Sequence, residues 1–396
     1  MVSTRKNKSI YIDTEALSSL ALVKAGLISP VDGLMDSETS KKVNETKYYK
    51  GVPFPFSFVL APSGKRNQEV IRSLKNGEIV DLINDKEKVG ELTVGEVFEI
   101  DPLERVQNIY GTTDIGHPGV KNTMARLGSL AVSGEYHVKY APIDESISML
   151  REMIEKNDAK KVTGLMLAAN PLNRSHERVI RDTLSRSDIV VLFLRKPFTE
   201  EGLSFDIRYD ALKLYVERFL PANKVAIVPF ENTYVFAGYN ELILDALLVK
   251  NYGCNELVVG TNHGGLGLYY DHNEIHTIFN QCKDIGLDIT TIDEYVYCEV
   301  CKTLVSNSTC PHGRHHHIHY NSNSIMKLIQ SGLIPPTILV RKEISASILA
   351  ALFPNRLKNI QEIYYSLMPS SGLLEDHSDE EFYVKLIELY QTTSLK

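Results

Sequence analysis

The hydrophobic and polar positions follow different patterns before and after about residue 145. Before it, short segments alternate apolar and polar residues and end at turn-forming residues, as half-buried strands do. Helical periodicity is scarce in this part, so we predict a mixed β domain with few helices. The predicted strands are FPFSFVLAPSGK (54–65), GEIVDLIND (77–85), GELTVGEVFEI (90–100) and YHVKY (136–140).

After residue 145, nearly continuous apolar segments alternate with amphipathic ones. Strands that are apolar on both faces are typical of a parallel sheet covered by helices, so this part predicts an α/β domain. Ligands of such sheets bind beyond the carboxyl ends of the strands. The predicted strands are 162–169, 188–197, 224–230 and 256–261, and the predicted helices are 145–156, 173–187, 206–220 and 241–253.

The last hundred residues change character again. Helices are predicted over SNSIMKLIQSGLIPP (322–336), KEISASILAALF (342–353) and EEFYVKLIELYQ (380–391). We therefore predict three parts: a β domain at 1–145, an α/β domain at 146–290, and a small C-terminal region at 291–396.

Composition and charge exclude some classes of protein. The chain has 396 residues, 43% of them hydrophobic, which is enough to build substantial cores. Lys and Arg number 43 against 50 Asp and Glu, a net charge of -7, so no global basic field favours nucleic acid. No apolar run has the length of a signal peptide core or a membrane span, so we expect a cytoplasmic protein without a membrane partner.

Cysteine and histidine gather in one segment. Of five cysteines and twelve histidines, Cys298, Cys301 and Cys310 precede a run of histidines that ends at His319. A Cys-x-x-Cys knuckle presents two thiolates to one ion, and a third Cys with a nearby His completes a tetrahedral Cys3His zinc site. With four protein ligands, the zinc would be structural.

The fourth ligand is predicted from the length of the loop after Cys310. Four residues separate Cys310 from His315, a spacing that suits a loop, so His315 is favoured over His312 and His316. An exposed polar loop with unliganded thiols is the alternative interpretation.

A candidate anion site follows the first strand of the α/β domain, in the segment NPLNRSHE (170–177). It opens a helix, and a helix N-terminus directs backbone N–H groups and a positive dipole toward an anion. Asn173 and His176 are three residues apart, so both could reach the same anion from the first turn. The alternative is that this histidine only caps or packs against the helix.

A second candidate follows the last strand of the sheet, in GTNHGGLG (260–267). Glycines permit close approach of the backbone to a ligand, and His263 would lie near His176 if the two strands were neighbours. No GxxxxGK[ST] sequence exists, so a P-loop is excluded.

These two motifs, in this order and at this separation, resemble those of the ATP sulfurylase (sulfate adenylyltransferase) family. The resemblance covers nearly the whole chain. It also includes PVDGLM (30–35), YGTTDIGHPGV (110–120), AGYNELILDALLVKNYGC (237–254), YCEVC (297–301) and TCPHG (309–313).

The resemblance implies a fold and an activity. The fold is a PUA-like β domain, a Rossmann-like nucleotidyltransferase domain and a small C-terminal part, commonly in a homodimer. In the reaction, an oxyanion attacks the α-phosphorus of ATP and pyrophosphate leaves, with Mg²⁺ as the counter-ion of the nucleotide. Some bacterial members also carry a zinc at the place that corresponds to the cysteine cluster.

The resemblance assigns roles to residues of the two motifs. It implies catalytic roles for Asn170, Asn173 and His176. Asn173 and His176 would stabilise the phosphate charge that develops in the transition state, and Asn170 would help to hold the nucleotide. The nucleotide-binding residues that it implies are Asn170, Arg174, His176, Gly260, Asn262, His263 and Gly265.

The chain departs from the family pattern at the acceptor side. Where the family has Gln-Thr-Arg before Asn-Pro, this chain has Leu167, Ala168 and Ala169, and Asn173 replaces the first histidine. Gly-Arg-Asp-His becomes Gly-Thr-Asn-His (260–263), and the C-terminal SGT-like segment becomes Ser-Asn-Ser (322–324). Losing two charged hydrogen bonds to an anion costs roughly 3–6 kcal/mol, or about two to four powers of ten in rate or affinity.

Three hypotheses follow from the retained and the lost residues. In the first, the protein transfers AMP from ATP to sulfate with an altered pocket. In the second, the reaction class persists with a larger or less anionic acceptor. In the third, the protein binds a nucleotide without turnover and acts as a regulator.

Overall fold

The computed structural model describes residues 7–196, 202–231, 238–260, 282–354, 381, 384 and 385. These residues form two compact units. The first comprises residues 1–166, 187–198 and 228–291, and the second comprises residues 167–186, 199–227 and 292–396.

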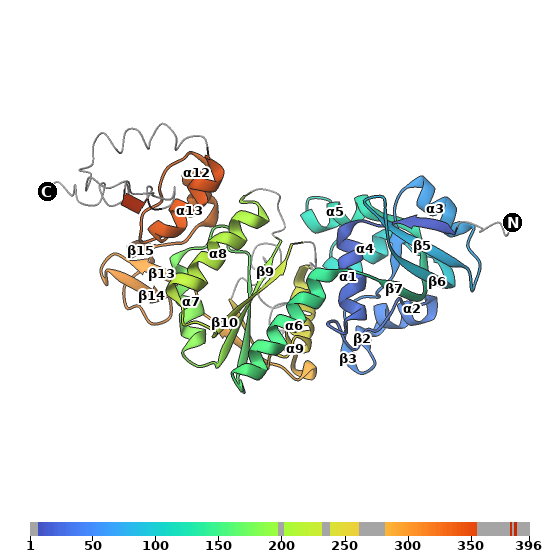
Figure 1. Cartoon of the computed structure of the whole chain (residues 1–396), viewed down its shortest axis with the longest axis horizontal. Coiled ribbons are helices and arrows are strands. Elements are labelled where there is room, and N and C mark those ends of the chain that lie inside the picture. The colour runs from blue at the N-terminus through green and yellow to red at the C-terminus, as the bar shows by residue number, and fades with distance from the viewer. Residues whose placement is uncertain are drawn as a thin grey trace, which may run out of the picture. The chain divides into compact units, whose positions relative to one another are not determined.

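The N-terminal part of the first unit is built on a five-stranded sheet in the order β1-β5-β6-β7-β4. Strands β5, β6 and β7 of this sheet are labelled in Figure 1. Strand β1 runs parallel to β5, and the β5–β6, β6–β7 and β4–β7 pairs are antiparallel. The strands are β1 (Lys8–Tyr11), β4 (Leu60–Pro62), β5 (Ile79–Asn84), β6 (Glu87–Glu99) and β7 (Leu127–Val138), and a separate pair is β2 (Tyr48–Tyr49) with β3 (Val52–Pro53). Its core includes Ile10, Leu82 and Tyr136, each fully buried.

The prediction of few helices in this part was wrong. Among its described residues, five helices precede residue 127: α1 (Thr14–Lys24), α2 (Ser37–Thr46), α3 (Lys65–Arg72), α4 (Pro102–Tyr110) and α5 (Pro118–Arg126). Helix α1 buries most of its residues and so lacks an amphipathic period, and the other four have only eight to ten residues. Their overlooked signal is the N-cap, because the Asp13, Asp36 and Asp101 carboxylates each accept a backbone N–H of the helix that follows.

The predicted strands and helices of the α/β part are confirmed. Five strands form a sheet in the order β10-β9-β8-β11-β12, and β8 runs parallel to β11. The chain moves outward from β8 to β9 and β10, then returns to the other side of β8, so the strand order reverses between β8 and β11. The elements are α6 (Ala141–Lys156), β8 (Val162–Leu167), α7 (Arg174–Leu184), β9 (Ile189–Arg195), α8 (Phe205–Phe219), β10 (Val225–Phe230), η1 (Gly238–Asn240), α9 (Glu241–Asn251), β11 (Glu256–Gly260), η3 (Lys283–Ile285) and β12 (Asp288–Ile292).

The interior of this sheet explains its apolar sequence. Residues 189–194 of β9 are all fully buried, and α9 buries every residue from Glu241 to Val249. The Phe193 ring packs against Phe230 and Tyr252, with centroids 5.7 and 5.4 Å away. The apolar strand β9 is therefore a central element of the sheet, as its sequence predicted. Helix α9 is also buried, although it contains the carboxylates of Glu241 and Asp245.

The C-terminal part of the second unit combines a small sheet with two helices. The sheet has the order β14-β13-β15, and β13 pairs antiparallel with both of its neighbours. The elements are β13 (Tyr295–Cys298), β14 (Thr303–Ser306), η4 (Arg314–His316), β15 (His317–Ile318), α12 (Ser322–Gln330) and α13 (Lys342–Leu352). Helices α12 and α13 are confirmed, and the predicted helix 380–391 lies almost entirely outside the described residues.

A membrane-crossing helix would need a long apolar run. Among the described residues, none of the helices is long and apolar enough to cross a membrane.

Gly164 of β8 tests the tight contact between this sheet and α9. A Cβ at this position would lie 2.6 Å from Val249 Cγ1 and 3.1 Å from Phe193 Cε2. We expect Gly164→Ala to reduce the free energy of unfolding by about 1–3 kcal/mol, because overpacking forces neighbours out of their preferred positions. Urea denaturation measures this change. Gly33→Ala is the matched control, since a Cβ there meets nothing within 4 Å, and equal stability of the two variants would contradict the prediction.

Candidate functional site

The turn after β8 is held by contacts from the segment around the start of α8. The Asn170 side-chain oxygen accepts the Leu203 N–H at 2.9 Å. The buried Arg208 guanidinium donates through Nη1 to the Ala168 carbonyl at 2.7 Å. Ala169 is buried and has a φ of 46°, in the left-handed region that alanine rarely adopts. Hydrogen bonds of two side chains, Asn170 and Arg208, therefore hold the turn before the helix begins.

A reciprocal capping box starts helix α7. The Asn173 side-chain oxygen accepts the His176 N–H at 3.1 Å, and His176 Nδ1 accepts the Asn173 N–H at 3.2 Å. Asn173 is buried, with 3% of its surface exposed. The structure thus brings two of the predicted catalytic residues together, and the Asn173 side chain caps the N-terminus of α7.

The cap also determines the protonation of the His176 ring. Because Nδ1 accepts a hydrogen bond from backbone N–H, the proton of the neutral ring resides on Nε2. Burial lowers the pKa of His176 to about 4, although neighbouring Glu177 favours the charged form. At neutral pH this side chain is an uncharged N–H donor at the N-terminus of a helix, where the backbone already favours anions.

Arg174 is engaged by the C-terminal part of the same unit. Its backbone N–H donates to the Leu339 carbonyl at 2.9 Å, and its Nε donates to the Thr337 carbonyl at 3.0 Å. Its Nη1 lies 3.1 Å from the Glu177 carboxylate. The guanidinium that was predicted to bind nucleotide therefore has partners within the protein.

Glu177 is the buried centre of this ion cluster. Arg341 donates two hydrogen bonds to its carboxylate, from Nε at 3.2 Å and from Nη2 at 2.7 Å. The Glu177 side chain is only 6% exposed. The Arg341 guanidinium also stacks over the Phe219 ring at 4.0 Å. Two arginines thus compensate one buried carboxylate in the residue that follows His176.

Sequence reasoning missed Arg208 and Arg341. Arg208 carried a detectable signal, because it shares one helical face with the buried residues Ala211, Leu212 and Tyr215. A charged residue on an apolar face needs a buried partner. Arg341 gave no comparable signal, since its partner Glu177 is far away in the sequence.

The second predicted motif is described only at its start. Gly260 ends β11, is exposed, and would accept a Cβ without any contact within 4 Å. Asn262, His263 and Gly265 lie outside the described residues. The pairing of β11 with β8 confirms that the strands preceding the two motifs are neighbours.

The basic pair at the end of β9 is paired with acidic residues. Arg195 forms ion pairs with Glu241 and with Asp245, two carboxylates of α9 whose side chains are 1% exposed. Lys196 lies 3.2 Å from Glu15. Neither cation is simply solvated, and Arg195 offsets the two buried charges of α9.

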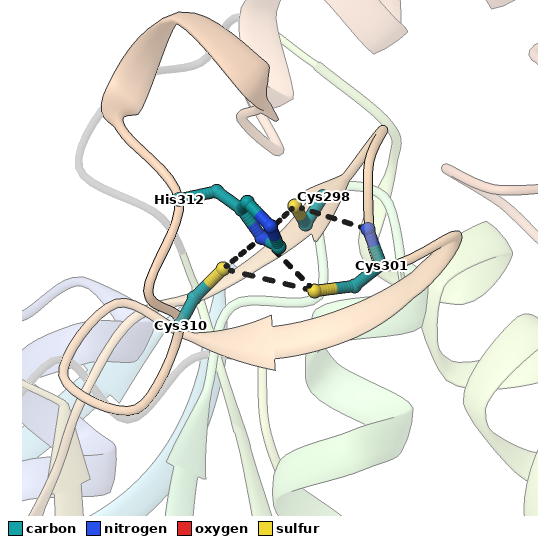
Figure 2. Close-up of side chains that lie close together, drawn as sticks. All are labelled: Cys298, Cys301, Cys310 and His312. Atoms are coloured by element: carbon teal, nitrogen blue, oxygen red, sulfur yellow. Dashed lines mark hydrogen bonds between the residues drawn. The ribbon is translucent and has the colours of Figure 1, made fainter.

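The cysteine cluster is assembled by the β13–β14 hairpin and the loop that follows it (Figure 2). One donor atom each from Cys298, Cys301, Cys310 and His312 lies within 4.8 Å of the others. His312 Nδ1 is 3.5, 3.3 and 3.6 Å from the three sulfurs in chain order. A tetrahedral ion with bonds of about 2.0–2.3 Å needs donor separations of roughly 3.5–3.8 Å, so this set could hold one metal ion.

The fourth member of the cluster corrects the sequence prediction. His312, one of the two alternatives to His315, lies with the three cysteines. His315 lies in η4, and its ring packs on His316 with centroids 4.0 Å apart. Only Pro311 separates His312 from Cys310, and the turn there directs its ring between the three sulfurs (Figure 2).

Two models of known protein families match the chain. Residues 143–351 match the family model described as ATP-sulfurylase, and residues 2–139 match that of a PUA-like domain. The sulfate adenylyltransferase of Chloroflexus aurantiacus is 27% identical over 353 residues, 87% of this chain and 91% of its own. That of Halothermothrix orenii is 29% identical over 349 residues, 85% of this chain and 90% of its own.

A solved structure shares the fold. The chain resembles a hexameric APS kinase from Thiobacillus denitrificans with a TM-score of 0.66 at 16% identity. The match covers 89% of this chain and 64% of that longer chain. At this identity, the likeness concerns the fold alone.

The buried Glu177–Arg341 pair predicts a large stability effect. Arg341→Gln should reduce the free energy of unfolding by about 3 kcal/mol, the lower end for a broken buried ion pair, because Arg174 remains beside Glu177. Urea denaturation measures the change. The control is Arg178→Ala on the same helix, whose pair with Asp182 is exposed and contributes less than about 1 kcal/mol. A loss no larger than that of the control would contradict a structural role for the pair.

The lowered pKa of His176 predicts a pH-dependent stability. The unfolded ring titrates near its ordinary value of 6.5 and the folded ring near 4, so the unfolded chain binds the proton more tightly. The contribution to stability is therefore complete above pH 6.5 and is lost as the pH falls toward 4, by up to about 3 kcal/mol. Unfolding curves of the wild type and of His176→Gln between pH 7 and 4 should diverge by this amount, and parallel curves would refute the assignment.

Proposed function

This chain belongs to the ATP sulfurylase family, and we propose that it is a nucleotidyltransferase that transfers AMP from ATP to sulfate and releases pyrophosphate. The observation that carries the proposal is the fixed turn before α7, which presents the uncharged His176 Nε2–H at a helix N-terminus. That donor suits the oxygens of a phosphate group whose negative charge increases during reaction. The enzyme class follows from the family, and the acceptor is the part that needs a test.

In the proposed mechanism, His176 contacts the reacting phosphate through Nε2–H and does not itself transfer a proton. Asn173 acts on the reaction through His176, because its side chain caps the helix and its N–H fixes the ring. Asn170 is proposed to contact the nucleotide from the turn. Donors that are already oriented cost no reorganisation when charge develops, which is the physical basis of this form of catalysis.

The nucleotide is proposed to lie beyond the carboxyl ends of β8 and β11. We propose Gly260, Asn262, His263 and Gly265 as its contacts from the second motif. Arg174 is assigned to holding the first motif in place, since its guanidinium is bound to Thr337 and Glu177. Mg²⁺ bound to ATP would neutralise part of the charge on its phosphates.

The metal centre is proposed to be a structural zinc site, with His312 as its fourth ligand. Four protein donors leave no coordination position for a substrate, so zinc there would cross-link the hairpin and its loop. A homodimer completes the proposal, as the resemblance to the family implies.

A different acceptor is the second candidate, because apolar residues replace the charged and polar ones of the family motif. Leu167 and Ala169 are both buried, with 6% and 1% exposure. Because these two side chains are buried, their apolar character removes charge from the motif but does not enlarge an acceptor pocket. The substitutions therefore favour a less anionic acceptor over a larger one. The loss of anion contacts remains the main argument against efficient use of sulfate.

Pyrophosphate release tests the proposal. The wild type should release pyrophosphate only when ATP, Mg²⁺ and sulfate are all present. His176→Ala should lower kcat by about 10²–10³, the usual effect of removing one donor to a transition-state anion. His176→Gln, which retains an N–H donor at a similar reach, should recover part of this loss. His137→Ala, a change at an exposed histidine of β7, is the control and should leave kcat unchanged.

The outcomes separate the three hypotheses. Release that depends on another acceptor and is independent of sulfate would favour the second candidate. Tight ATP binding by calorimetry without turnover on any acceptor would indicate a regulator and overturn both enzymatic proposals.

A further inference from the structure

His317 is placed beside the metal cluster by the register of the small sheet. It lies in β15, directly opposite Cys298 of β13 in an antiparallel pair. Residues opposite each other in such a pair project from the same face of the sheet. The backbone therefore directs His317 toward the side on which the cysteine ligands gather.

The His317 ring contacts one sulfur of the cluster. Its Nε2 lies 3.3 Å from Cys310 Sγ. Its other nitrogen, Nδ1, is buried and has no hydrogen-bond partner among the described atoms. His317 is outside the set of four donors that could share one ion, and its Nε2 lies within hydrogen-bonding distance of a member of that set.

The net charge of the metal centre explains why an N–H donor beside a cysteine sulfur would be favourable. A divalent ion with three thiolates and one neutral imidazole has a net charge of -1, which N–H donors to sulfur would stabilise. Cys298 Sγ already receives the Cys301 backbone N–H at 3.4 Å. Cys310 has the His317 ring in the corresponding role.

We propose that His317 is a positioning residue of the metal centre, which donates Nε2–H to the Cys310 thiolate and holds it against the ion. The inference rests on the proposed metal centre but adds a residue that coordination alone does not require. Partners that orient metal ligands in this way typically affect metal affinity by about 10–100-fold.

Cobalt substitution of the full-length protein tests the inference. Co²⁺-loaded wild type should show d–d bands of a tetrahedral S3N site and thiolate-to-cobalt charge-transfer bands. His317→Ala should keep the d–d bands, shift the charge-transfer bands, and release Co²⁺ to a chelator about 10–100-fold faster. His317→Gln, which keeps an N–H donor, should recover part of the affinity. His319→Ala is the matched control, because that ring is 46% exposed and lies near Glu294 rather than near sulfur.

Four results are decisive. The inference is supported if His317→Ala changes the charge-transfer bands and the release rate while His319→Ala changes neither. It is overturned if His317→Ala behaves as the wild type. It is also overturned if His317→Ala loses the tetrahedral d–d bands as His312→Ala should, because His317 would then be a ligand. A wild type that binds neither Co²⁺ nor Zn²⁺ at about one ion per chain would overturn the metal centre itself, and that result differs from the other three.

Discussion

The capping box between Asn173 and His176 is the interaction on which the candidate site depends. Two hydrogen bonds satisfy backbone N–H groups that the first turn of a helix leaves without partners. The same two bonds fix which nitrogen of the imidazole carries the proton and where that nitrogen points. The hydrogen bonds that cap the helix thus also orient the Nε2–H of His176 as a donor. Helix capping and anion binding by His176 are therefore compatible, because both use the same ring position.

Buried charge maintains this geometry. Glu177 lies next to His176 and brings a carboxylate into the interior, which costs free energy. Arg174 and Arg341 offset this cost with three hydrogen bonds to the carboxylate. Because Arg174 also binds the Thr337 carbonyl, the start of α7 is joined to the segment before α13. The start of α7 is therefore held by residues that are distant from it in the sequence, Thr337 and Arg341.

The cysteine cluster follows a related principle, in which secondary structure brings four potential metal ligands together. The β13–β14 hairpin presents Cys298 and Cys301, and the loop after it supplies Cys310 and His312. The knuckle and the third cysteine were predictable, because two thiolates at Cys-x-x-Cys spacing converge on one point whatever the surrounding fold. The histidine was not, since five histidines follow within a few residues and only the path of the loop selects one.

The sequence by itself determined the strands and helices of the α/β part, the three cysteines of the cluster, and the family, because these depend on periodicity and short spacings. It underestimated the N-terminal helices, of which four have only eight to ten residues and α1 is buried over most of its length. Only the tertiary structure decided the partners of Glu177, the contact of Arg208 with the turn, and the choice of His312. These depend on contacts between residues that are distant in sequence or on the exact path of a loop, and local patterns carry no information about such contacts.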